Sequence, residues 1–162
     1  MPDVSESGTH AAPISEQLTD NTALPKDLRY ATLLLRIAIG VGLLSAVADR
    51  FGLWGAPGQP SVAWGTFGRF LAYAAVLNPW CPTVLLPTLG WLVTITELGL
   101  GIAALANFRL RLTALLTALL TTTFAIAMTW TLGVHAHLNY SVFTFSAGSY
   151  LMSAVSRTRL GK

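Results

Sequence analysis

Long apolar stretches separated by short polar connections dominate the chain after residue 29. Four of them approach the roughly 20 apolar residues that a helix needs to cross a bilayer. They cover residues 30–48, 83–106, 110–132 and 139–156, and the last is the shortest and most polar. This pattern predicts an all-α integral membrane protein, built as a four-helix transmembrane bundle.

A shorter periodic segment lies in the long connection between the first two apolar stretches. Thr66, Arg69 and Tyr73 occupy one side of it, and Asn78 and Pro79 follow it. Apolar residues recur on the other side at helical spacing: Phe67, Phe70, Leu71, Ala74 and Leu77. About 13 residues are too few to span a bilayer, so the pattern predicts an additional interfacial or re-entrant amphipathic helix between helices one and two.

Composition supports the membrane class and divides the chain into three parts. Hydrophobic residues make up 53% of the 162 residues and charged residues only 10%, whereas about a quarter of the residues in a soluble domain are charged. Residues 1–29 hold five of the seven acids and two bases, and they lack the apolar core of a signal peptide. We therefore expect a disordered acidic cytoplasmic tail at 1–29, a membrane domain at 30–156 and a short basic cytoplasmic tail at 157–162.

Basic residues are distributed unequally between the two ends of the predicted helices. Seven Lys and Arg residues flank the end that carries both termini, while Arg50 and Arg69 flank the other. The positive-inside rule then places the N- and C-termini in the cytoplasm. Because the bases are dispersed over helix ends rather than clustered on one face, the expected partner is the lipid bilayer and not nucleic acid.

Glu97 is the most informative residue, because an acid at the centre of a membrane costs at least about 2.5 kcal/mol. It shares a stripe of small and polar residues with Thr94; the whole stripe is Pro87, Gly90, Thr94, Glu97, Gly101 and Ala104. Counted from the predicted cytoplasmic helix ends at 1.5 Å per residue, Arg36 lies about 9 Å deep and Glu97 about 14 Å deep. These depths predict an intramembrane polar site of Glu97, Arg36 and Thr94.

The role of this predicted site stays open on sequence grounds. One interpretation is an ion pair that fixes helix register. Another is a site that binds a quinone or relays protons, and a third is a chance placement with the charges reaching toward lipid headgroups. Asp49, Arg50 and Arg69 are expected at the outer membrane interface.

Three weaker candidates lie in the predicted outer loops. His135 and His137 lie in a short loop. This loop is a solvated connection with no further role, or its histidines are pH-responsive or quinone-facing groups, or they form part of a metal site with Asp49. Zinc usually needs three or four protein ligands, so no metal site is predicted. Cys81 is the only cysteine, which excludes an internal disulfide and leaves a small apolar residue or a mixed disulfide with another chain.

Hydroxyl residues recur along the third and fourth predicted helices. The third is rich in threonine, and the fourth carries a stripe of Ser146, Ser149, Ser153 and Ser156. Hydroxyls in a bilayer bond carbonyls of their own helix or reach a neighbouring helix, so we interpret these stripes as packing surfaces rather than as a ligand path.

Four segments of the chain resemble the DoxX family of small bacterial membrane proteins, which includes the DoxD-like subunit of thiosulfate:quinone oxidoreductase. They are ADRFGLWGAPG, VAWGTFGRFLAYAAVLNPW, GWLVTITELGLGIAAL and NYSVFTFSAGSYL, within residues 30–156. The resemblance implies a four-helix protein of the bacterial inner membrane. Some members of the family are linked to sulfur oxidation, quinone reduction or oxidative-stress complexes.

The leading hypothesis is an integral inner-membrane subunit of a quinone-linked oxidoreductase, with a quinone beside Glu97 and Arg36. The sequence has no recognisable flavin, haem, iron–sulfur or nucleotide motif, so a soluble or membrane redox partner subunit would supply the electron carrier. The alternatives are a small channel or transporter, which would need a homo-oligomer, and a non-catalytic membrane scaffold or assembly factor.

Overall fold

A computed structural model describes residues 26–133, 135 and 141–157 of the chain. The chain divides into two units, Met1–Ala31 and Thr32–Lys162. Of the first unit, the structure describes only residues 26–31, which are helical. Most of the predicted N-terminal tail, and all of the predicted C-terminal tail except Arg157, lie outside the described residues.

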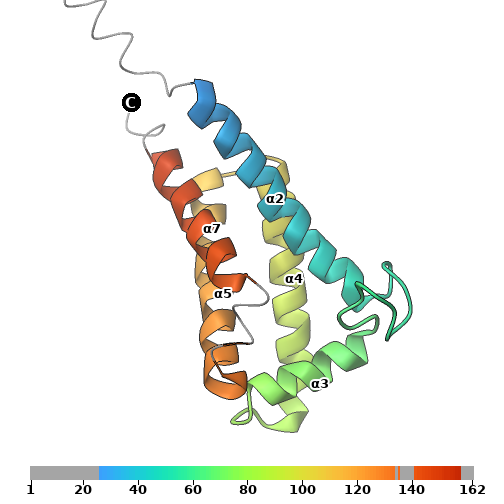
Figure 1. Cartoon of the computed structure of the whole chain (residues 1–162). Helices are drawn as coiled ribbons and strands as arrows, with labels where there is room; N and C mark the ends of the chain where they lie inside the picture. The colour runs from blue at the N-terminus through green and yellow to red at the C-terminus, as the bar shows by residue number, and fades with distance from the viewer. Residues whose placement is uncertain (1–25, 134, 136–140, 158–162) are drawn as a thin grey trace, which may run out of the picture. The chain divides into compact units, whose positions relative to one another are not determined.

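The described part of the chain is all-α and contains no strand. Five α-helices and one short 3-10 helix follow one another (Figure 1). In chain order they are α2 (Lys26–Arg50), α3 (Phe67–Leu77), η1 (Thr83–Leu85), α4 (Leu86–Leu105), α5 (Leu110–Leu132) and α7 (Val142–Arg157).

Three segments are long and apolar enough to cross a membrane: Lys26–Arg50, Thr83–Leu105 and Leu110–Leu132. They correspond to the first three predicted membrane helices, although α2 begins four residues before the predicted start and ends two residues after the predicted end. With 16 residues, α7 is shorter than the usual crossing of about 20. The fourth crossing therefore stays a prediction.

The amphipathic segment forms α3, as its periodicity predicts. Thr66 caps its start by accepting a hydrogen bond from the Arg69 amide at 3.3 Å. Asn78 ends it, donating from Nδ2 to the Ala74 carbonyl at 2.9 Å. The buried residues Phe70, Ala74 and Leu77 all come from the predicted apolar face, and Arg69 is exposed.

The hydroxyl stripes of α5 and α7 meet where these two helices lie side by side (Figure 1). Thr117 and Ser149 are fully buried there. Thr117 donates to the Thr113 carbonyl at 2.9 Å and Ser149 to the Phe145 carbonyl at 2.8 Å, each within its own helix. The burial and the bonding of these hydroxyls within their helices agree with the predicted packing role.

One hydroxyl pair joins the two helices directly. Thr122 Oγ1 and Ser146 Oγ are 2.5 Å apart, and Ser146 also donates to the Ala118 carbonyl at 3.1 Å. We expect Thr122→Val and Ser146→Ala to show a coupling of about 0.6 kcal/mol in the free energy of unfolding, the usual value for a hydrogen bond between membrane helices. A double-mutant cycle measures it. The exposed Thr123, which bonds only its own helix, should show no coupling to Ser146.

Helices α2 and α4 run antiparallel and approach each other most closely at two glycines. A Cβ built on Gly40 would lie 2.7 Å from Leu105 Cγ and 3.1 Å from the Gly101 carbonyl oxygen. Close approach of this kind is typical of small residues at membrane helix interfaces. From this contact α2 diverges from α4 toward α3 (Figure 1). Arg50, the last residue of α2, still contacts Thr94 and Glu97 on α4.

Candidate functional site

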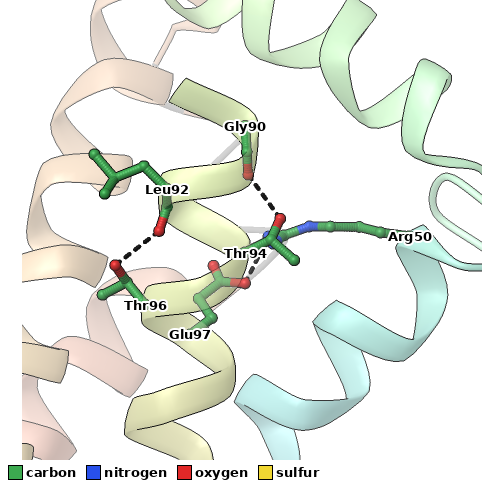
Figure 2. Close-up of polar contacts among 6 residues, drawn as sticks. All are labelled: Arg50, Gly90, Leu92, Thr94, Thr96 and Glu97. Carbon is green, nitrogen blue, oxygen red and sulfur yellow. Dashed lines mark hydrogen bonds and ion pairs between the residues drawn. The ribbon is translucent and has the colours of Figure 1, made fainter. Parts of the chain in front are cut away.

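Arg50 and Glu97 form a buried ion pair between the end of α2 and the middle of α4. Arg50 Nη2 lies 2.6 Å from Glu97 Oε2, and the two side chains are 2% and 5% exposed. Arg50 Nη1 also donates to Thr94 Oγ1 at 2.9 Å. Figure 2 shows the arginine reaching across from α2 to both residues, which lie one turn apart on α4.

Thr94 is itself held in place by its helix. Its hydroxyl donates to the Gly90 carbonyl at 2.7 Å, so its oxygen is turned toward the guanidinium as an acceptor (Figure 2). The predicted stripe on α4 is buried at Gly90, Thr94, Glu97, Gly101 and Ala104. The sequence therefore identified the face of α4 that carries the site.

Two aromatic rings cover the guanidinium of Arg50. Its Cζ lies 3.8 Å from the ring centroid of Phe70 and 5.4 Å from that of Trp64, and these two rings meet edge to face. A desolvated cation over an aromatic face gains about 2 kcal/mol. Arg50 thus joins α3 and its preceding loop to α2 and α4.

Asp49 fixes the loop that supplies one of these rings. It is buried, and its Oδ2 accepts a hydrogen bond from the Trp64 backbone amide at 2.8 Å. Asp49 was expected at an exposed interface as a weak candidate ligand. The structure instead makes it a positioning residue for Trp64.

Some polar atoms of the site are buried without a hydrogen bond. Arg50 Nε and Asp49 Oδ1 have no partner, and Glu97 Oε2 has only its ion-pair contact with Arg50. An unsatisfied buried polar atom costs about 1–3 kcal/mol. Such atoms in a folded protein often mark a position that a water or a ligand completes.

The prediction that Arg36 pairs with Glu97 is wrong, because Glu97 pairs with Arg50. Arg36 comes one turn before Gly40 and Glu97 one turn before Gly101. Since the antiparallel helices meet at these glycines, the two charges lie on opposite sides of the contact, about 12 Å apart along the axis. Arg36 remains half-buried elsewhere on α2.

Arg50 was expected at the outer membrane interface, and the structure adds that its side chain is buried within the protein, at 2% exposure. The sequence held a signal for its burial. The buried positions of α2 recur at spacings of three and four and continue without a break to Arg50: Ile39, Gly40, Leu43, Val47 and Arg50. This periodicity places Arg50 on the inner face of the helix.

Neither His135 nor Cys81 shares an ion pair or a hydrogen bond with Arg50 or Glu97 in the described part of the chain. His135 is exposed, and His137 lies outside the described residues. Cys81 is half-buried, and its Sγ lies 3.7 Å from the Pro82 carbonyl oxygen. Within the described ranges, no three His, Cys, Asp or Glu residues come together to hold a metal ion.

Comparison with protein families, with curated proteins and with solved structures finds no match to this chain. The chemistry of the site must therefore be read from its own groups. A guanidinium fixed by a carboxylate and a hydroxyl offers strong N–H donors at one place, and the surrounding rings exclude water.

Proposed function

We propose that this chain is the membrane subunit of a redox system and that a quinone binds at Arg50, Thr94 and Glu97. The observation that carries the proposal is the burial of Arg50 among a carboxylate, a hydroxyl and two aromatic rings while its Nε lacks a partner. A quinone carbonyl accepts hydrogen bonds from a guanidinium. Apolar, aromatic walls with a few convergent polar groups are typical of sites for small molecules.

A run of aromatic rings supports access to this site from the bilayer. Phe51 and Trp91 are each 48% exposed, and both contact Phe67, with ring centroids 6.0 and 4.8 Å away. Phe67 lies 5.8 Å from Phe70, the ring that covers Arg50. The rings therefore form one packed cluster that extends from the exposed surface to the buried guanidinium.

The membrane topology belongs to the same proposal. We place α7 as a fourth crossing, α3 at the outer membrane interface, and both termini in the cytoplasm of a bacterial cell. Exposed indoles support this orientation: Trp80 is 76% exposed just before η1, and Trp130 is 88% exposed near the end of α5. Tryptophans are enriched at the headgroup level.

Membership of the DoxX family is part of the proposal as well. Three of the four segments that carry the resemblance supply the groups around Arg50. The first contains Asp49 and Arg50, the second Trp64 and Phe70, and the third Thr94 and Glu97. Electron transfer would require a partner subunit with its own redox cofactor.

We do not propose a channel. The hydroxyls that a channel would need along its path are bonded to carbonyl groups within α5 and α7.

The proposal is tested by titrating a short-chain quinone into the purified protein and following binding calorimetrically. We expect saturable binding by the wild type. Arg50→Lys keeps the charge beside Glu97 but loses the planar set of donors, so affinity should fall at least about tenfold, as for one hydrogen bond to a charged group. Glu97→Gln should weaken binding in the same direction, because it releases the guanidinium.

Arg69→Lys is the matched control. Arg69 is exposed on α3, so the same substitution there should leave the affinity unchanged. Absence of saturable binding by the wild type, or equal affinities of wild type and Arg50→Lys, would exclude a quinone site at Arg50.

A further inference from the structure

Helix α2 carries Arg36 near its middle and Arg50 at its end, and of these two only Arg50 has an acidic partner among the described residues. Arg36 and Arg50 are fourteen residues apart in the sequence, which is about 21 Å along a helix. Arg50 pairs with Glu97. Arg36 Nε is buried without a hydrogen bond in the described part of the chain. From residue 32 onward the only acidic side chains are Asp49 and Glu97, and both lie at the Arg50 end.

The position of Arg36 on α2 places it near the turn between α4 and α5. It lies one turn before Gly40 on the same helical face, and Gly40 contacts Leu105, the last residue of α4. Side chains on a helix lean toward its N-terminus, which carries the guanidinium beyond that contact. The turn that follows Leu105 leads to Arg109 and Arg111, which are both exposed.

Three arginines therefore lie toward one end of this unit, and no ion pair joins them to a carboxylate among the described residues. Arg109 is held beside the Phe108 ring, with its Cζ 5.8 Å from the centroid. It is also the N-cap of α5 and makes no side-chain cap bond, so the first amides of α5 add positive polarity at the same place. This concentration of positive charge favours the binding of an anion.

We propose that Arg36, Arg109 and Arg111 bind the phosphate of an anionic phospholipid. Guanidinium groups match the oxygens of a phosphate and form charge-assisted pairs with it. In the proposed topology this end faces the cytoplasmic leaflet, where anionic lipids attract basic residues next to the membrane. Leu33, Leu34 and Ile37 are exposed on α2 beside Arg36 and offer an apolar surface for acyl chains, which a free phosphate ion would not need.

Native mass spectrometry of the full chain released from lipid nanodiscs tests this site. We expect the wild type to retain one phosphatidylglycerol or cardiolipin molecule from nanodiscs containing that lipid, and no phosphatidylcholine. Arg36→Gln should lower retention about tenfold, the loss expected for one charge-assisted hydrogen bond. Arg69→Gln makes the same charge change on exposed α3 and should retain the lipid as the wild type does.

A double variant protects the test against misfolding of Arg36→Gln. Arg109→Gln with Arg111→Gln alters only exposed side chains and should also reduce retention. Equal retention by wild type and this double variant would overturn the proposal, and so would equal retention of phosphatidylcholine. Displacement of the lipid by millimolar inorganic phosphate would assign the site to free phosphate instead. None of these outcomes depends on whether a quinone binds at Arg50.

Discussion

Arg50→Leu is expected to lower the free energy of unfolding by about 3–5 kcal/mol, because it leaves Glu97 buried with no compensating charge. The Arg50 guanidinium is 2% exposed, 2.6 Å from the Glu97 carboxylate and bonded to Thr94. The substitution also removes the cation between the Phe70 and Trp64 rings. Unfolding of the purified protein in mixed detergent micelles, followed by far-UV circular dichroism, measures the loss.

Removing both charges should restore most of this stability. Replacing a buried ion pair with apolar side chains is often neutral or stabilising, so Arg50→Leu combined with Glu97→Leu should unfold near the wild-type midpoint. Arg69→Leu removes an exposed arginine and should change the free energy by no more than about 0.5 kcal/mol. If Arg50→Leu lost no more than this control, the ion pair would not hold the helices together.

The same double variant separates structure from function. Its fold should survive, because no charge is left uncompensated, but it has no guanidinium to donate to a carbonyl. On the proposed function it should be stable and yet fail to bind the quinone. A stable double variant that binds the quinone normally would leave the ion pair with a purely structural role.

Local signals in the sequence were sufficient to place most helices. The bounds of α5 agree with the predicted residues 110 and 132, where a polar turn and Gly133 flank a mainly apolar run. Asn78 marked the end of α3, whereas Thr66, which was placed on the polar side of the helix, proves to be its N-cap. The buried face of α4 followed from the spacing of its small and polar residues, including Thr94 and Glu97.

The partner of Glu97 could not be found in this way, because it depends on how two helices cross. Depth counted from helix ends assumes that both helices start level and run parallel to the bilayer normal. The contact of Gly40 with Gly101 and Leu105 sets a different register, in which the long Arg50 side chain reaches across to Glu97. This register is a tertiary property, and no pattern within either helix reports it.

The burial of Asp49 and Arg50 also depends on a loop whose path the sequence did not reveal. Gly52 and Gly65 both have positive φ, and a Cβ on Gly52 would lie 2.9 Å from the Gly65 carbonyl oxygen. Glycine adopts this conformation without the cost that other residues incur. The two ends of the loop thus meet closely, and Trp64 is brought onto Arg50.

Gly40→Val is expected to lower the free energy of unfolding by about 1–3 kcal/mol, the usual cost of forcing extra carbon atoms into a packed interface. A Cβ at this position would meet Leu105 at 2.7 Å and the Gly101 carbonyl oxygen at 3.1 Å. The leucine can move, but the backbone oxygen cannot move without shifting α4. The helices must therefore separate, and Arg50 should be drawn away from Glu97.

This separation predicts coupling between two distant substitutions. Once Gly40→Val has weakened the ion pair, adding Arg50→Leu should lower the free energy of unfolding by less than it does in the wild type. In a double-mutant cycle in detergent, the loss in the double variant should therefore be smaller than the sum of the two single losses. The difference should exceed the usual additivity error of about 0.5 kcal/mol. Gly99→Ala is the control, because a Cβ at Gly99 meets nothing within 4 Å. Alanine there should be neutral or stabilise α4 by up to about 1 kcal/mol. Strict additivity of Gly40→Val and Arg50→Leu would mean that the glycine contact does not set the register in which Arg50 reaches Glu97.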